Sequence, residues 1–267
     1  MPNAILPTRL MEVAEEAARA GGAVLRDWLG RFTTREKGPA DLVTDADLAS
    51  QEAIRTIIAE RFPEHEFLGE ESPGGRELPS DGTIVWVVDP LDGTTNYVHG
   101  FPFFAVSVAA VQGDSILAGV IYDPLQDAAY RAAAGAGAWL GPRQLSVSGV
   151  TKLSEALVAV SFPPQVRVDS PDLLDFLAVV DRCQAVRRTG SAALNLAGVA
   201  AGYLDAHWAT AINAWDVAAG ILLIREAGGT VTGASGGPFD LWRADFLATS
   251  TPSLHAELCS CLGRPTK

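Results

Sequence analysis

The most informative part of this chain is residues 84–96, with the sequence IVWVVDPLDGTTN. Its run from Ile84 to Asp89 is β-branched, aromatic and apolar up to the final aspartate, which predicts a buried strand. We expect the strand to end at Pro90, because proline has no N–H to donate to a central ladder. The carboxylates of Asp89 and Asp92 then lie on a tight turn at the edge of a sheet. There, both can converge with a backbone carbonyl on one point.

Carboxylate and carbonyl oxygens are the ligands that hard cations such as Mg²⁺ prefer. Two unpaired carboxylates this close would repel each other, so a bound cation explains their spacing. The following residues, Thr94 to Asn96, predict the first turn of a short helix, whose N–H groups near Gly93 can bind an anion. A metal site beside an anion site is the arrangement that transfer of a phosphoryl group to water requires. An ordinary turn at a strand end is the alternative explanation of DPLDG.

Three further segments place acidic residues at the ends of apolar runs: DLVTDAD (41–47), FLGEES (67–72) and WD (215–216). Each has a simpler explanation. Glu70 and its neighbour can be a solvated pair, and Asp47 and Asp216 can be N-caps of helices that begin beside them. Asp41 and Asp45 are expected at the surface. These explanations are independent of one another, whereas one metal site accounts for the acidic segments together.

The composition is that of a globular protein, with 267 residues, 48% hydrophobic and 19% charged. This length suits one large α/β domain or two smaller lobes. The formal net charge is -12, which disfavours nucleic acid and anionic membranes as partners. The same charge repels an anionic substrate unless bound cations reverse the local sign. The sequence contains no apolar run of about eighteen residues that could span a membrane.

Cysteine content and the N-terminus favour a cytoplasmic location. Cys183, Cys259 and Cys261 cannot all pair within one chain, and no CxxC motif is present, so a reducing environment is the simplest expectation. Residues 1–10 lack both the basic and the apolar region of a signal peptide.

Hydrophobic periodicity predicts alternating helices and strands. The expected helices are residues 8–29, 48–61, 170–180, 192–201 and 216–226. The expected strands are residues 84–89, 104–111, 116–122, 157–162 and 204–208, with a short strand or hairpin at 31–37 and a possible edge strand at 145–147. The pattern changes near residue 150, which predicts an N-terminal lobe over residues 1–150 and a C-terminal lobe over 151–267.

Other catalytic schemes find little support. No GxSxG motif surrounds Ser191, and no Cys–His nucleophile pattern occurs. The segment GAGAWLG (135–141) has the wrong spacing for a dinucleotide-binding loop and is interpreted as a tight hairpin. The four histidines are scattered without a zinc-binding spacing, and His99 is expected to be structural.

Four blocks in this order resemble the inositol monophosphatase family: DLVTDAD (41–47), GEES (69–72), DPLDGTTNYVHGFPFFAVSVA (89–109) and WDVAAGILLIREAGG (215–229). The likeness extends from about Ala14 to Ala248. It implies an α/β (α+β) fold, the layered α/β/α/β/α sandwich of the sugar-phosphatase type, in two lobes. The N-terminal lobe would carry most metal ligands, and the C-terminal α/β lobe would supply Asp216 and substrate contacts. The resemblance also implies a homodimer and inhibition by lithium.

The resemblance further implies a set of ligands for two or three Mg²⁺ ions. Glu70, Asp89 and the carbonyl of Leu91 would hold the first, and Asp89, Asp92 and Asp216 the second. Glu70 would also help to hold a third ion through waters.

Other positions take roles from the same resemblance. Asp47 and Thr94 would polarise the attacking water, with Glu70 counted among the catalytic residues. The backbone amides of Gly93 and Thr94 would receive the phosphate. Contacts to the substrate would come from Gly190, Ser191, Asp92 and Asp216, and Lys37 would lie on a loop that closes over the site.

The implied function is Mg²⁺-dependent hydrolysis of a small phosphate monoester, most simply inositol 1-phosphate, by activated water without a phospho-enzyme. Ala209 stands where relatives that prefer inositol phosphate usually have glutamate, and Asn213 where some have histidine. Alternatives within the family are fructose 1,6-bisphosphate, histidinol phosphate and 3′-phosphoadenosine nucleotides. A non-catalytic protein that binds metal or anions and acts through a partner is the alternative of another class.

Overall fold

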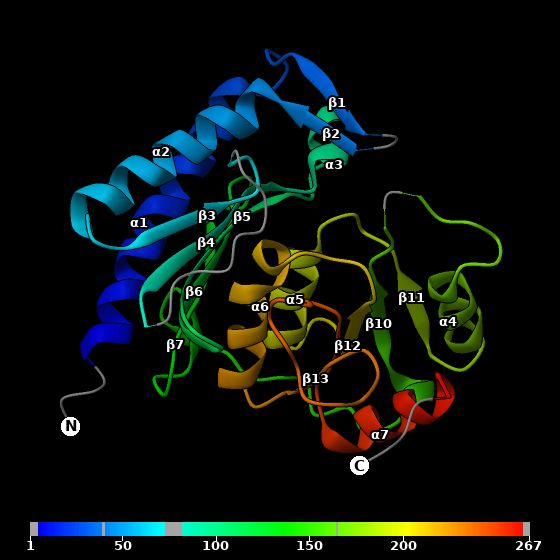
Figure 1. Cartoon of the computed structure of the whole chain (residues 1–267). Helices are drawn as coiled ribbons and strands as arrows, with labels where there is room; N and C mark the ends of the chain where they lie inside the picture. Colours follow the sequence, from blue (N-terminus) through cyan, green and yellow to red (C-terminus); the bar gives the residue numbers. More distant parts are fainter. Residues whose placement is uncertain (1–4, 39–40, 73–81, 164, 264–267) are drawn as a thin grey trace.

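Two β-sheets separated and flanked by helices build the protein, as the computed structural model in Figure 1 shows. It describes residues 5–38, 41–72, 82–163 and 165–263. The helices are α1 (Ile5–Trp28), α2 (Asp45–Arg61), α3 (Thr94–Val98), α4 (Pro171–Val180), α5 (Ala192–Ala200), α6 (Ala214–Glu226) and α7 (Pro252–Cys261). No helix within these residues is both long and apolar enough to cross a membrane.

The first sheet comes from the N-terminal half of the chain. Its order is β3-β4-β5-β6-β7-β8-β9, in which β3 and β4 are parallel and the remaining neighbours antiparallel. The strands are β3 (Glu66–Gly69), β4 (Ile84–Asp92), β5 (Ala105–Gln112), β6 (Ser115–Asp123), β7 (Ala128–Ala133), β8 (Ala138–Leu140) and β9 (Arg143–Gln144). A separate hairpin pairs β1 (Thr34–Gly38) with β2 (Asp41–Thr44).

The second sheet comes from the C-terminal half and has the order β11-β10-β12-β14-β13. Its strands are β10 (Leu157–Val160), β11 (Ala185–Arg187), β12 (Ala206–Ala209), β13 (Thr230–Thr232) and β14 (Phe246–Thr249). Because β10 is parallel to both β11 and β12, the carboxyl ends of these three strands meet at one edge of the sheet. Ligands of open α/β sheets commonly bind at such an edge.

Five layers result. Helices α1 and α2 pack together on one face of the first sheet, and α5 and α6 lie between the two sheets (Figure 1). Helix α7 contacts β14 and α4 on the far side of the second sheet. The α/β/α/β/α sandwich expected from the resemblance is confirmed, while the boundary between lobes at residue 150 stays a prediction.

A glycine lets α6 approach the first sheet closely. A Cβ atom at Gly119 of β6 would lie 2.7 Å from the Cα of Ala219, so any larger residue would push the helix away. Small residues on both partners therefore set this spacing.

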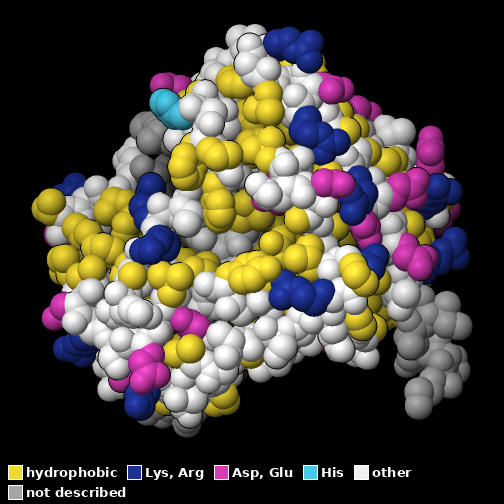
Figure 2. Space-filling model, turned by 180° about the vertical axis from the view of Figure 1, so that it is seen from behind, with side chains coloured by type: hydrophobic (Ala, Val, Ile, Leu, Met, Phe, Trp, Pro, Cys, Tyr) yellow, Lys and Arg dark blue, Asp and Glu magenta, His cyan; other side chains and the backbone are white. Residues whose placement is uncertain are grey.

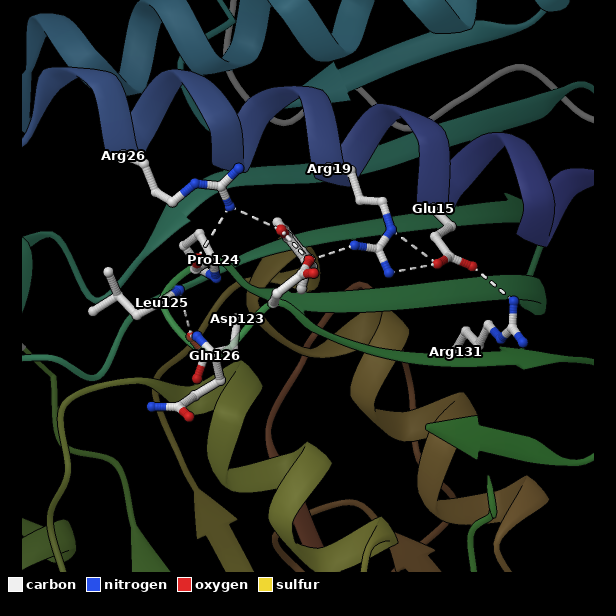
Figure 3. Close-up of polar contacts among 10 residues, drawn as sticks. Glu15, Arg19, Arg26, Asp123, Pro124, Leu125, Gln126 and Arg131 are labelled. Atoms are coloured by element: carbon white, nitrogen blue, oxygen red, sulfur yellow. Dashed lines mark hydrogen bonds and ion pairs between the residues drawn. The ribbon is translucent and has the colours of Figure 1, made fainter. Parts of the chain in front are cut away.

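Polar contacts fix α1 against the turn between β6 and β7 (Figure 3). Arg26 donates hydrogen bonds to the Tyr122 hydroxyl and the Pro124 carbonyl, at 2.9 and 3.0 Å. Arg19 pairs with Asp127 near one end of this contact. Exposed ion pairs contribute little free energy each, so their effect here is mainly to fix the orientation of α1.

Strand β4 does not end at Pro90, so that expectation was wrong. Asp89 pairs with Ser107 and Asp92 with Ala105, so three residue steps on β4 oppose two on β5. This extra residue is a β-bulge, one of the few places where proline fits inside a sheet. The Pro90 carbonyl accepts a hydrogen bond from Ser50 of α2 at 3.0 Å, which holds the bulge in place.

The two helices that carry acidic site residues begin before the predicted N-caps. Thr44 is the N-cap of α2 and Asn213 is the N-cap of α6. Asp47 and Asp216 instead occupy the third helical position, where each accepts a hydrogen bond from the N-cap backbone N–H and completes a capping box.

Most other predicted elements are present, and the GAGAWLG segment is a hairpin between β7 and β8. Residues 145–147 are not a strand; the pairing residues are Arg143 and Gln144, just before them. Strands β2, β3, β7, β11, β13 and β14 and helix α7 were not predicted, because they are short or lack strong periodicity. The described cysteines are free thiols.

Stability should depend on pH through His207 of β12. Its ring is fully buried, its Nε2 lies 3.0 Å from the Ser161 hydroxyl, and burial lowers its pKa to about 3. The unfolded chain takes up this proton near pH 6.5, so the stabilisation is present above that pH and is lost as the pH falls towards 3. The maximum slope is about 1.4 kcal/mol per pH unit.

We therefore expect the free energy of unfolding of the wild type to fall more steeply below pH 6.5 than that of His207→Gln. Urea unfolding in chelator at several pH values measures both profiles, and the variant removes only this titration from the comparison. Parallel profiles for the two proteins would show that His207 is not the group responsible.

Candidate active site

The bulge in β4 brings the first two site carboxylates together. Side chains of a regular strand alternate between faces, so residues three apart would point to opposite sides. The extra residue shifts this phase, and Asp89 and Asp92 converge with Asp216 from the first turn of α6. One carboxylate oxygen from each of the three lies within 4.8 Å of the others. The structure thus brings together three of the predicted ligands from two separate elements.

The cluster is electrostatically costly without a cation. Burial, followed by the charges of Glu70, Asp216 and Asp92, raises the pKa of Asp89 well above its usual value. Burial, with the charges of Glu70 and Asp92, raises the pKa of Asp216 to about 8. Both pKa shifts have the same two causes: each carboxylate is removed from water, and each lies beside other negative charges.

Asp92 is held by the N-terminal end of α5. Its carboxylate accepts hydrogen bonds from the backbone N–H groups of Ala192 and Ala193, at 3.2 and 2.9 Å, and from the Ser191 hydroxyl. Burial still outweighs these bonds and raises the pKa of Asp92 to about 6. Ser191 is the N-cap of α5 and is buried, so its side chain orients Asp92 and does not line the cavity. A direct contact between Ser191 and substrate stays a prediction.

Thr94 links the bulge to α2. Its hydroxyl lies 3.1 Å from the Leu91 carbonyl and 3.4 Å from a carboxylate oxygen of Asp47. The other Asp47 oxygen accepts a hydrogen bond from the Thr44 backbone N–H at 2.8 Å, so this buried carboxylate is firmly oriented. The predicted pair of Asp47 and Thr94 is therefore assembled beside the acidic cluster.

Two glycines allow the two halves of the chain to meet. Gly93 has φ of 96°, and a Cβ there would lie 3.1 Å from the Phe103 carbonyl oxygen. Gly190 has φ of 90°, and a Cβ there would lie 2.8 Å from the Asn96 amide. Both positions thus combine a backbone conformation that favours glycine with close contacts.

Asn96 connects these two loops, a role the sequence did not reveal. Its side-chain amide donates to the carbonyls of Phe103 and Thr189, at 2.7 and 2.8 Å. The loop before α5 is thereby tied to α3, and Gly190 remains beside Gly93. The polar residue that ends the DGTTN segment was the available signal, but its partner Thr189 is far away in sequence.

Asp92 and Asp216 line a cavity of about 430 Å³, within the usual range for small-molecule sites, whereas Asp89 is buried and is not part of this lining. Of the predicted residues, those that line it are Glu70, Asp92, Gly93, Thr94, Gly190 and Asp216. The C-terminal half adds Ser161, Phe162, Arg188 and Asn213. Ala209 is buried in β12 and is not part of this lining. The side chain of Lys37 lies outside the described part of the structure.

The donor set fits a hard divalent cation. Every candidate ligand is an oxygen, and the raised pKa values of Asp89 and Asp216 show that the site favours positive charge, whether protons or metal. His99 is exposed and is not among the residues lining the cavity.

Comparison with known proteins identifies relatives of this chain by sequence. The chain matches the family model "Inositol monophosphatase family" over residues 7–264. It is 40% identical to the inositol-1-monophosphatase of Synechocystis sp. over 255 residues, covering 94% of this chain and 88% of that protein. It is 39% identical to the fructose-1,6-bisphosphatase/inositol-1-monophosphatase of Aquifex aeolicus, covering 92% of each.

The fold agrees as well. The crystal structure of the extragenic suppressor protein suhB from Bartonella henselae superposes with a TM-score of 0.88 at 37% identity, covering 95% of this chain and 98% of that one. Sequence blocks, site geometry and fold thus point to one relationship. This chain belongs to the inositol monophosphatase family.

Proposed function

We propose that this chain hydrolyses small phosphate monoesters with Mg²⁺ as its cofactor, and that inositol 1-phosphate is one of its substrates. The observation that carries the proposal is the convergence of Asp89, Asp92 and Asp216, of which Asp92 and Asp216 line a cavity of about 430 Å³. The relative from Synechocystis supports the choice of inositol 1-phosphate, and the one from Aquifex widens it to fructose 1,6-bisphosphate.

The cations would be held by the ligands expected from the sequence: Glu70, Asp89, the Leu91 carbonyl, Asp92 and Asp216. When bound, two or three Mg²⁺ ions would lower the pKa of water and neutralise charge on the phosphate and the leaving group. The protein supplies the geometry. Each of the three clustered aspartates accepts at least one hydrogen bond from a backbone N–H, of Leu91, Ala193 or Asn213, which fixes where its carboxylate points.

Asp47 and Thr94 would orient the attacking water. The Asp47 carboxylate is buried and already accepts a hydrogen bond from the Thr44 backbone, so it can accept one from the Thr94 hydroxyl without moving. The Thr94 oxygen would then present a lone pair to a water hydrogen in the cavity that it lines. The amides of Gly93 and Thr94 would receive the phosphate beside this water. Lithium inhibition and a cytoplasmic location stay predictions.

Asp89→Asn should abolish turnover. The substitution keeps the size of the side chain and its acceptor for the Leu91 N–H, but removes a charged ligand shared by two cations. A loss of several kcal/mol of transition-state stabilisation corresponds to at least about a hundredfold in kcat. Phosphate release from inositol 1-phosphate with Mg²⁺ measures it. Asp114→Asn, in the exposed turn between β5 and β6, is the matched control and should keep normal activity. A near-normal kcat for Asp89→Asn would refute the assignment.

Metal binding should also be visible in stability. Without metal, removing one of the repelling carboxylates should stabilise the fold, so Asp216→Asn in chelator should melt at a higher temperature than the wild type. Mg²⁺ should raise the melting temperature of the wild type more than that of the variant, because binding to the native state stabilises it. Thermal unfolding with and without Mg²⁺ tests both statements. Equal Mg²⁺ responses in wild type and Asp216→Asn would argue against a metal at this cluster.

We also infer that two copies associate through α4. Leu174, Leu177 and Val180 on this helix are 56, 54 and 41% exposed, and Figure 2 shows hydrophobic side chains gathered over the edge of the molecule that α4 forms. An exposed apolar patch of this kind commonly marks an interface between two identical chains.

The double substitution Leu174→Lys with Leu177→Lys should therefore convert a dimer to a monomer. Sedimentation velocity measures the change in mass. Leu125→Lys changes an exposed leucine in the turn between β6 and β7 and serves as the control, which should remain dimeric. A wild type that sediments as a monomer, or a dimeric double variant, would remove α4 as the interface.

A further inference from the structure

The wall of the cavity that faces the acidic cluster comes from the second sheet. Its residues follow the carboxyl ends of three parallel strands: Ser161 and Phe162 after β10, Arg188 after β11, and Ile212 beyond β12. The part of a substrate remote from the scissile phosphate would contact this wall. Its chemistry therefore decides which esters fit.

Arg188 is the only basic side chain among the described residues that line the cavity. Its guanidinium carbon lies 5.6 Å from the centre of the Phe162 ring, within the range of a cation–π contact. Phe162 in turn packs edge-on against Phe176 of α4, with ring centres 5.9 Å apart. This stack holds the guanidinium at the rim of the cavity.

The guanidinium has no ion pair within the described part of the chain. Arg19, Arg35 and Arg61 pair with carboxylates, whereas Arg188 is exposed and stacks on Phe162. An exposed arginine that stacks on an aromatic ring keeps its N–H groups free for an incoming anion. Its planar fork suits phosphate and carboxylate oxygens in particular.

The same wall has no carboxylate that could accept hydrogen bonds from the hydroxyl groups of a neutral polyol. The acidic side chains that line the cavity, among the described residues, are the candidate metal ligands Glu70, Asp92 and Asp216. Ala209 offers no acceptor, and it is buried away from the cavity. Acceptors for hydroxyl groups are then limited to neutral side chains such as Ser161 and Asn213, whereas an anion can pair with Arg188.

We propose that Arg188 binds a second anionic group of the substrate, so that this enzyme prefers phosphate monoesters with a phosphate or carboxylate at the end remote from the scissile bond. This inference rests on the proposed function. In it, the cluster of carboxylates and cations handles the scissile phosphate, and Arg188 determines specificity at the other end of the cavity. Hydrogen bonds to ionised partners are the stronger class, which makes one such contact sufficient to rank substrates.

Two matched pairs of esters test the proposal. Fructose 1,6-bisphosphate and fructose 1-phosphate differ by one distal phosphate, and 6-phosphogluconate and glucitol 6-phosphate differ by one distal carboxylate. We expect the wild type to have a higher kcat/KM for the member with the second anionic group in at least one pair. Arg188→Gln should lower kcat/KM for that member about tenfold and leave its partner nearly unchanged. The pair that responds identifies the preferred anion, and Arg188→Lys should retain part of the preference.

Arg182→Gln is the matched control. Arg182 is exposed and lies before β11, whereas Arg188 follows that strand, so the control removes the same charge outside the cavity. It should preserve the preference of the wild type for both pairs. The preference of the wild type should also weaken as salt is added, because the Arg188 contact is near the surface.

The outcomes separate this inference from the function on which it rests. Normal turnover without a preference for either ester that carries a second anionic group would overturn the role of Arg188 and leave the phosphatase assignment intact. An equal loss for both members of a pair in Arg188→Gln would do the same, since it would place Arg188 at the common phosphate or in the packing of Phe162. Absence of Mg²⁺-dependent turnover of every ester by the wild type would contradict the proposed function itself.

Discussion

The structure depends on placing like charges together away from water. Asp89, Asp92 and Asp216 would each be more stable in solvent or far apart, and their raised pKa values express that cost. Carboxylates on a flexible loop would move apart and relieve the repulsion. Here each carboxylate stands on a rigid element instead, two on a strand buried along its length and one in the first turn of a helix between the sheets. The fold supplies the rigidity that this arrangement requires.

Backbone N–H groups do much of this positioning. Leu91 holds Asp89, the first turn of α5 holds Asp92, and the N-cap of α6 holds Asp216. A helix N-terminus carries a partial positive charge, so α5 and α6 both stabilise and orient the anions that they face. These bonds only partly offset burial, because the pKa values of Asp92 and Asp216 remain above the ordinary value. The remaining negative potential is what attracts a cation.

Sequence reasoning found the acidic segments because charge at the end of an apolar run is unusual in any local context. It also found β4, β5, β6 and α6, whose patterns are long enough to be clear. It missed the bulge at Pro90, because the phase of a strand is set by its register with a partner, here β5, and not by its own residues. Sequence reasoning also could not show that Asp92, 99 positions earlier, accepts a hydrogen bond from the Ser191 hydroxyl.

Residues from the two halves of the chain divide the work at the cavity. The first half carries Asp47, Glu70, Asp89, Asp92 and Thr94, and these are fixed by the sheet, by α2 and by the bulge. The wall from the second half is built from residues that follow strand ends, where a substitution disturbs no ladder or helix. Exchange of a side chain such as Arg188 can therefore alter which ester is accepted without displacing a carboxylate. Differences in substrate among relatives with similar folds are then expected to reside in this wall, and the carboxylate cluster alone does not predict them.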